Sequence, residues 1–278
     1  MARLTKHEKI KVAIGIAAIV LIILFAATAR LSAFDFLRIW PVSEGKSTDP
    51  IEEPRNQTVN YSRDKVRELS IDWVGDDINI ITGNVDQIEV TEEIGTGVSE
   101  AAAKPASISL TGSGTLSILD DSADGVDLGK LKTDGRKHLT VMLPADMGAA
   151  LASITIDGVY SSLNVKGAAA ESLSLDGMGG DVSVDGELRD LLSVDGMLGD
   201  ISLKLSGSAP RKIELDGMLG DSEITLPEGS GFTVNVDGMS ADLTSDLPLE
   251  HNGSTYRYGD GTTEISVSGM TGDVRIDG

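Results

Sequence analysis

LDGMGGDVSV, at residues 175–184, decides the fold, because close copies of it recur as VDGMLGDISL at 194–203 and LDGMLGDSEI at 215–224. Looser copies stand at 156–165, 236–245 and 267–276. The Asp-Gly pairs begin at Asp157, Asp176, Asp195, Asp216 and Asp237, so the spacings are 19, 19, 21 and 21 residues. A fixed period near twenty predicts a solenoid, in which each repeat buries its apolar face by stacking on its neighbours.

Each repeat alternates apolar and polar residues. Leu173 and Leu175 fall on one face, with Ser172 and Ser174 on the other, and the alternation resumes after the Gly-Met turn. Period two is the signal of β-strands, and no helical stripe after residue 66 is long enough to predict a helix. The glycines of the turns stand where a sharp corner needs a positive φ; they are Gly177, Gly196, Gly217 and Gly238. The sequence therefore predicts an all-β solenoid of 19–21-residue rungs.

Composition agrees with narrow rungs. Aromatic residues make up 4% of the chain, so aliphatic side chains must fill the core, and 32 glycines are enough for several turns per repeat. The chain has no cysteine, which excludes disulfides, thiolate metal sites and a cysteine nucleophile.

Charge divides the chain into two parts. Residues 1–30 carry five basic residues and one acidic residue, a charge of +4, so the rest of the chain carries −25 of the total of −21. An acidic body is poorly suited to nucleic acid, whose affinity comes largely from Lys and Arg contacts to phosphates. A basic head and an acidic body suit opposite sides of a membrane.

The segment 12–29 is an uncharged run of 18 residues, close to the ~20 residues that a membrane-spanning helix needs. Basic residues precede it, so the positive-inside rule predicts a cytoplasmic tail at 1–11 and an extracytoplasmic remainder. The alternative is a cleaved signal peptide with a cleavage site at Ala27-Thr28-Ala29. The length of the apolar run, and Arg30 directly after it, favour a single-pass anchor. Both interpretations export the body of the chain.

The segment 30–65 reads as a juxtamembrane stretch and spacer, because 41–62 contains three prolines and no apolar periodicity. The repeat domain is predicted for 66–278, with diverged strands before the clear copies, such as HLTVMLP at 138–144. Two polar stretches, 120–137 and 246–264, interrupt the array. Insertions in solenoids gather on one face and often carry the binding function.

Taken together, the anchor, the spacer, SIDWVGDDINIITGNVDQIEV (70–90), the TVMLP strand (140–144) and the serial DGMxGD rungs resemble the bacterial putative-adhesin domain family of unknown function. That family is related to the C-terminal domains of cell-envelope stress-response proteins. The resemblance implies a right-handed β-helix-like solenoid, with one sheet per face, outside a bacterial membrane. It supplies no catalytic residues.

Two columns of aspartates are candidate ligands for a cation. Stacking should align Asp176, Asp195, Asp216 and Asp237, the first Asp column, and also Asp181, Asp200, Asp221, Asp242 and Asp273, the second Asp column. Rungs ~4.8 Å apart would bring carboxylates close enough to share calcium. The alternative is that the Asp before each turn glycine caps that turn through its own side chain. The calcium-binding nonapeptide repeat is absent, which favours capping, and Asp120–Leu131 is only a weak match to a calcium loop.

The methionines that follow the turn glycines are interpreted as core filling rather than as ligands of a soft metal; they are Met178, Met197, Met218, Met239 and Met270. Three histidines (His7, His138 and His251) and the lack of the common catalytic motifs give no support to catalysis. The candidate recognition loop is Tyr256, Arg257 and Tyr258, and packing of that loop on the end of the array explains it equally well.

The sequence thus predicts a membrane-anchored, extracytoplasmic β-repeat protein that acts as a non-enzymatic binding or sensing module at the cell envelope. The expected partner is a cell-envelope protein or polymer. The alternatives are a structural or self-associating surface protein, because solenoid ends expose strand edges, and, with less support, a polysaccharide-active enzyme.

Overall fold

Strands separated by short turns make up nearly all of the described chain. The structure is a computed structural model that describes residues 49–120, 136–147, 150–159, 161–237, 242–269 and 271–278. One 3-10 turn, η2 (Arg63–Lys65), is the single helical element in these ranges, which confirms the all-β class. None of the described helical residues forms a helix long and apolar enough to cross a membrane. The predicted anchor at 12–29 lies outside the described residues.

The strands follow the predicted alternation closely. Their bounds are β1 (Arg55–Tyr61), β2 (Glu68–Val74), β3 (Asp77–Gly83), β4 (Ile88–Ile94), β5 (Ser107–Leu110), β6 (Thr115–Leu119), β7 (Lys137–Pro144), β8 (Leu151–Val159), β9 (Ser162–Asp176), β10 (Val182–Asp195), β11 (Ile201–Leu205), β12 (Lys212–Asp216), β13 (Ser222–Thr225), β14 (Phe232–Asp237), β15 (Leu243–Thr244), β16 (Glu250–Asn252), β17 (Thr255–Tyr258), β18 (Thr263–Ser268) and β19 (Val274–Asp277).

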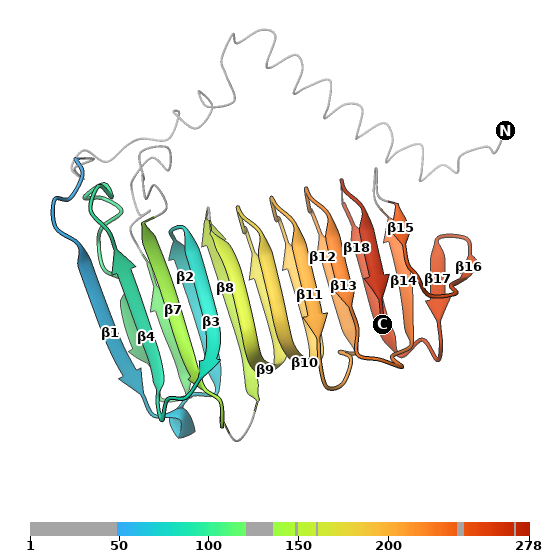
Figure 1. Ribbon diagram of the computed structural model, residues 1–278, viewed down its shortest axis with the longest axis horizontal. Helices are drawn as coiled ribbons and strands as arrows, with labels where there is room; N and C mark the ends of the chain where they lie inside the picture. Colours follow the sequence, from blue (N-terminus) through green and yellow to red (C-terminus); the bar gives the residue numbers. More distant parts are fainter. Residues whose placement is uncertain (1–48, 121–135, 148–149, 160, 238–241, 270) are drawn as a thin grey trace, which may run out of the picture. The chain divides into compact units, whose positions relative to one another are not determined.

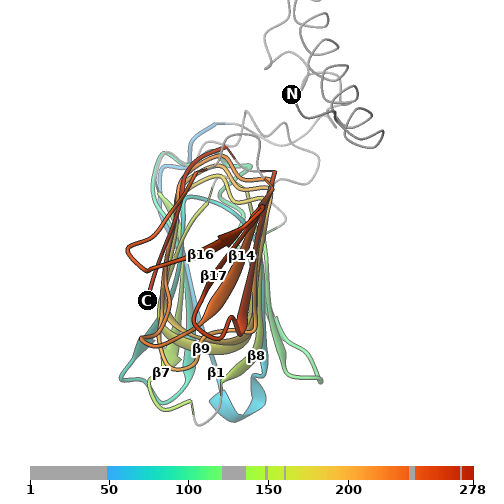
Figure 2. The ribbon, with the colours of Figure 1, turned by 90° about the vertical axis from the view of Figure 1, so that its right-hand side faces the viewer.

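The strands form two walls with the core between them, as the view along the array shows (Figure 2). The first wall runs in the order β5, β6, β2, β8, β9, β10, β12, β18, β14, β17, β16. The second wall runs in the order β1, β4, β7, β3, β9, β10, β11, β13, β19, β15. The long strands β9 and β10 take part in both walls, so each of them turns a corner without a break in the strand.

Successive repeats pair in parallel and keep their register, apart from two local irregularities between β9 and β10. Asp176 pairs with Asp195, and Asp195 pairs with Asp216, so equivalent positions of neighbouring repeats lie side by side. The diverged strands join the same array, because β2 pairs with β8 and β3 pairs with β9. Each repeat therefore acts as a rung, with one strand in each wall (Figure 1).

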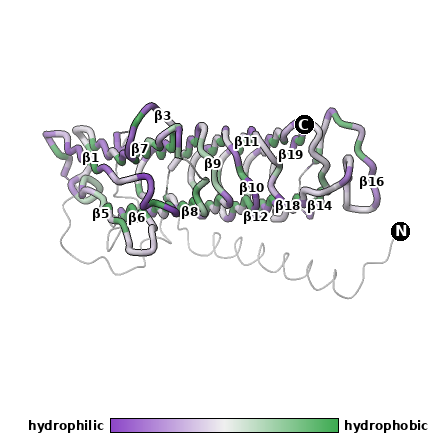
Figure 3. The backbone as a smooth tube through the Cα atoms, turned by 90° about the horizontal axis from the view of Figure 1, so that it is seen from below, coloured by the Kyte–Doolittle hydropathy of each residue, from purple (hydrophilic) through white to green (hydrophobic). Residues whose placement is uncertain are grey.

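The core is a stack of aliphatic side chains along the inner sides of both walls, and hydrophobic positions recur along both walls (Figure 3). Met178, Met197 and Met218 are fully buried, as predicted for core filling. The two largest buried aromatic side chains, Trp73 and Phe232, lie in β2 and β14, towards opposite ends of the array. Each buried Leu or Ile adds ~1.5–3 kcal/mol relative to an exposed one, so stacking is the main source of stability.

The spatial order of the rungs departs from their sequence order at both ends. The rung β18–β19, last in the sequence, lies between β12–β13 and β14–β15. At the other end, β2 lies between β6 and β8, and β3 lies between β7 and β9. The last rung, β18–β19, therefore returns into the interior of the array, whereas at the other end the later strands β6 and β7 are added outside β2 and β3.

Antiparallel strands cover the ends. The strand β1 pairs with β4, and Gln57 and Tyr61 of β1 donate hydrogen bonds to the carbonyls of Ala106 and Ile108, which belong to the other side of the array. At the far end, the hairpin β16–β17 pairs with β14. Two stretches expected to be irregular therefore contain strands: β1 lies inside the predicted spacer, and β16 and β17 lie inside the polar stretch 246–264. In both places, the backbone hydrogen-bond partners come from neighbouring strands, and the local composition does not predict this pairing.

Candidate functional site

The first Asp column is aligned but interrupted. Asp176, Asp195 and Asp216 lie on consecutive strands, whereas Ser268 of β18 stands between Asp216 and Asp237. The sequence-derived expectation of an unbroken ladder to Asp237 is therefore wrong at its last step, because β18 is inserted there. The hydroxyl of Ser268 donates a hydrogen bond to Asp216 Oδ1 at 2.8 Å.

The second Asp column links the rungs through hydrogen bonds. Asp181 Oδ1 accepts the backbone N–H of Asp200 at 3.0 Å, and Asp200 Oδ1 accepts that of Asp221 at 2.9 Å. Asp221 Oδ1 in turn accepts the N–H of Asp273 at 2.8 Å. Asp242 continues the column beyond Asp273 by register. The carboxylates of Asp181, Asp200 and Asp221 therefore each bond to the next rung. Within the described ranges, the side chains of Asp176 and Asp195 make no hydrogen bond, so the turn capping expected of the first Asp column is wrong for these two residues.

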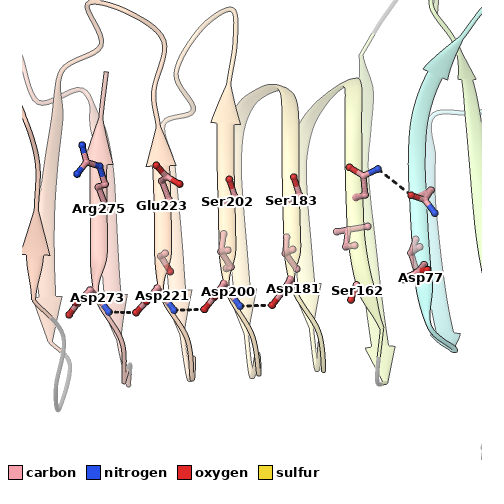
Figure 4. Close-up of a pocket in the computed structure, with 17 residues that line it drawn as sticks. Asp77, Ser162, Asp181, Ser183, Asp200, Ser202, Asp221, Glu223, Asp273 and Arg275 are labelled. Atoms are coloured by element: carbon pink, nitrogen blue, oxygen red, sulfur yellow. Dashed lines mark hydrogen bonds between the residues drawn. The ribbon is translucent and has the colours of Figure 1, made fainter. Parts of the chain in front are cut away.

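A long groove runs over the outer side of the second wall, across β3, β9, β10, β11, β13 and β19, and has a volume of about 850 Å³. Figure 4 shows the second Asp column along one side of it, with Ser183, Ser202 and Glu223 on a parallel row. At the β3 end, Asn164 Nδ2 donates to Asn79 Oδ1 at 3.2 Å. The groove thus presents carboxylates and neutral hydrogen-bonding groups at intervals of one rung.

The groove is acidic for most of its length. Its one basic side chain among the lining residues is Arg275, which is paired with Asp246 and Asp277 at 2.6 and 2.7 Å. The hydrogen bond and charge of Asp277, together with Asp246, raise the pKa of Arg275. The backbone N–H of Asp246 lowers the pKa of Asp277, with Arg275 as a further cause. Because the charge of Arg275 is already matched by two carboxylates, the carboxylates of the second Asp column set the sign of the groove.

A short groove of about 210 Å³ lies on the outer side of the first wall. It contains Asp195 and Asp216 of the first Asp column, with Glu214, Ser266 and Ser268 beside them. Among the described residues, no group of three or more His, Asp or Glu side chains is arranged to hold a metal ion. Calcium binding by this column stays an untested alternative. Of the weak loop match Asp120–Leu131, only Asp120 lies in the described part of the chain.

The candidate recognition loop is part of a strand that covers the end of the array. Tyr258 packs on the buried Phe232, with ring centroids 5.7 Å apart, and Tyr256 stacks on His251 at 4.5 Å. Arg257 is exposed, and its guanidinium donates to the carbonyl of Asp260 at 2.5 Å. The tyrosines therefore contribute to end packing, and Arg257 is the member of the trio that remains accessible.

The histidines stand apart from one another. His138 in β7 contacts Asp77 at 3.0 Å, whereas His251 lies in β16 at the opposite end of the array. His7 and the residues Met239 and Met270 lie outside the described residues. Of the two histidines in the described ranges, only His138 lies near the long groove, because its partner Asp77 lines the β3 end of that groove.

Sequence reasoning missed the serine and asparagine row of the long groove. Ser183 and Ser202 occupy the position two residues after an Asp of the second column, and Asn79 and Asn164 occupy the same place in their rungs. Aligning the outward positions of the repeats would have found this row. The groove itself was not visible in the pattern, because it depends on how the side chains of several neighbouring strands lie together.

Comparisons with known proteins agree with the fold. The sequence profile of the family described as Toastrack DUF4097 matches residues 66–277. The fold is similar to that of a "putative cell adhesion protein" from Clostridium sporogenes, with a TM-score of 0.50, 12% identity, and 81% of this chain and 99% of that chain covered. A "putative adhesin" from Bacteroides fragilis has a TM-score of 0.48, 12% identity, and coverage of 82% and 98%. A search of curated proteins finds no match.

Proposed function

Since the chain belongs to the Toastrack DUF4097 family, we propose that it is a non-enzymatic binding module displayed on the outer side of a bacterial membrane. In this proposal the segment 12–29 anchors a right-handed β-solenoid, the N-terminus is cytoplasmic, and the repeat domain is extracytoplasmic. The charge split of +4 against −25 around that segment supports this orientation.

The long groove is the proposed binding surface, and one observation carries this choice. Four carboxylates of the second Asp column stand one rung apart along a continuous groove of about 850 Å³. A rung spacing of ~4.8 Å suits an extended ligand better than a compact one. A row of negative charge on a strongly acidic body favours a ligand with positive charge along its length.

The proposed ligand is therefore a cationic, extended segment of a cell-envelope protein or polymer. The serine and asparagine row would hydrogen-bond to its backbone or side groups, which adds orientation to the charge attraction. In the sensing part of the proposal, occupation of the groove is the signal that such a ligand is present at the envelope.

Binding of a fluorescent oligolysine to the full chain in detergent tests this function. In the variant Asp200→Asn with Asp221→Asn, each side-chain oxygen can still accept the N–H of the next rung, while two groove charges are removed. We expect severalfold weaker binding, and the loss should shrink as salt rises.

The matched control is Asp195→Asn with Asp216→Asn, which removes the same charge from the first wall. Its binding should stay close to that of the unmodified chain. Equal losses in the two double variants would mean that oligolysine responds to total charge and not to the groove.

Self-association is the second candidate function. It is supported by β18, which comes late in the sequence but lies between β12 and β14. A polysaccharide-active enzyme has less support, because the grooves display aspartates and serines without an aromatic platform among their lining residues.

A further inference from the structure

The C-terminal strands clasp one rung from both sides. The strand β14 pairs with β17 along one edge and with β18 along the other, and β15 pairs with β19. We call residues 250–278, which contain β16 to β19, the C-terminal clamp. The clamp reaches its place through a short connection, residues 245–249, that follows β15.

The inner strand of the clamp, β18, lies between β12 and β14, and it pairs in parallel with both of them. Ile213 of β12 pairs with Ile265 of β18, and Ile265 pairs with Val234 of β14. The inner strand of the clamp is therefore held by the same parallel pairing on both of its edges. Nothing in that pairing distinguishes the clamp of one molecule from the clamp of an identical molecule.

The connection is long enough to reach a neighbouring molecule. Five extended residues span up to about 17 Å, which exceeds three strand spacings of ~4.8 Å. Exchange of an identical element preserves every contact of the closed form except those of the connection itself. The contacts of the connection are two hydrogen bonds, from the N–H of Asp246 to Asp277 and from the N–H of Leu247 to Ser245, the ion pair of Asp246 with Arg275, and the packing of two partly buried leucines on the core. The leucines are Leu247 and Leu249.

We propose that two copies of this chain self-associate by exchanging their C-terminal clamps, so that β18 of one molecule lies between β12 and β14 of the other. The partner is a second copy of the chain, and the interface consists of strand edges that the closed form already uses. This proposal does not depend on what the long groove binds, so it succeeds or fails separately from the proposed function.

Single cysteines report which molecule supplies the inner strand, and the natural chain has none to interfere. Glu214 and Ser266 are paired neighbours on β12 and β18, and paired strand positions at ~4.8 Å fall within the Cα range of a disulfide. Two full chains with different tags, one carrying Glu214→Cys and the other Ser266→Cys, are co-expressed, purified in detergent and oxidised. We expect a disulfide-linked pair that contains both tags.

Ser193 and Glu214 give the matched control, because they are paired neighbours on β10 and β12, outside the clamp. Chains that carry Ser193→Cys and Glu214→Cys separately should form no mixed pair, although both changes in one chain should close a disulfide within it. A chain with both Glu214→Cys and Ser266→Cys verifies that the clamp geometry permits the bond.

Two results would overturn the proposal. One is the absence of the mixed pair when the doubly substituted chain forms its disulfide as a monomer. The other is a mixed pair of equal yield from the Ser193→Cys and Glu214→Cys chains, which would indicate unspecific association.

Discussion

Lys137 and Asp120 form an ion pair that is completely enclosed by the protein. Lys137 Nζ lies 2.5 Å from Asp120 Oδ2, and the two side chains are 0% and 1% exposed. The ammonium group also donates to the carbonyl of Ala102 at 2.9 Å and stands 4.9 Å from the ring centroid of Trp73. Asp120 directly follows β6, and Lys137 is the first residue of β7. The pair therefore links the end of β6 to the start of β7 inside the core.

Removing one member of this pair should be costly, because it leaves the other charge buried. Lys137→Met is expected to lower the free energy of unfolding in urea by about 3–5 kcal/mol. Adding Asp120→Asn to the same chain should recover part of that loss. Arg211→Met, at an exposed ion pair with Asp190, should change stability little. Equal effects of Lys137→Met and Arg211→Met would contradict the enclosed pair.

Glu92 should make stability depend on pH. Its side chain is fully buried, and it accepts hydrogen bonds from the N–H of Ala106 at 3.0 Å and from Gln57 at 2.6 Å. Burial raises the pKa of Glu92 above 4.5, against the smaller lowering by these hydrogen bonds and by Lys137; Asp120 adds to the rise. A raised pKa in the folded state means that the protonated acid is favoured by folding. Its contribution is present below about pH 4.5 and is lost as the pH rises through the folded pKa.

The test compares the unmodified chain with Glu92→Gln, which cannot ionise, in urea at acidic and at neutral pH. As the pH rises, the unfolding free energy of the unmodified chain should fall relative to that of Glu92→Gln, whichever of the two is larger at acidic pH. A difference that stays constant with pH would show that the pKa of Glu92 is the same in the folded and in the unfolded chain.

Two turn glycines should respond differently to a side chain. Gly196 has a φ of +67°, and a Cβ there would lie 3.9 Å from its nearest neighbour, so Gly196→Ala costs only backbone strain of about 1–2 kcal/mol. A Cβ on Gly220 would lie 2.1 Å from the carbonyl oxygen of Gly199 in the next rung. Gly220→Ala should therefore be the more destabilising change in urea melts. The reverse order would disprove the close approach of the rungs at this corner.

Calcium should not stabilise the protein specifically. Any salt screens the repulsion within an acidic body, so calcium and magnesium at matched ionic strength should give the same Tm. Specific binding would instead add a term that grows with calcium concentration. A calcium-specific rise in Tm that disappears in Asp195→Asn with Asp216→Asn would establish the first Asp column as a cation site.

Local pattern was enough to predict what depends on neighbours in sequence. The alternation around Leu173 and Leu175 gave the strands, and Gly177 and Gly196 have the positive φ expected at corners. Met197 is buried where the repeat places it. These features follow from period two and from turn chemistry, which operate over a few residues.

The order of the rungs could not be predicted, because similar rungs can pair with one another in any order. Asp216 can pair equally well with Asp237 or with Ser268, and only the path of the chain between them decides for Ser268. The enclosed position of Lys137 was equally hidden, since a lysine at the start of a strand is usually solvated. For the candidate site, the Asp columns were predictable from spacing, but the long groove was not.

Labelling of a single cysteine on cells tests the central claim, that the second wall carries a binding groove outside the membrane. Ser202→Cys lies in the groove on β11, and Thr155→Cys is an equally exposed position on β8 in the first wall. A membrane-impermeant maleimide is added to cells whose outer layer has been opened, with and without oligolysine. We predict that both cysteines react and that oligolysine slows only the reaction at Ser202→Cys. Failure of both cysteines to react until the membrane is broken, or equal protection of both by oligolysine, would contradict the account.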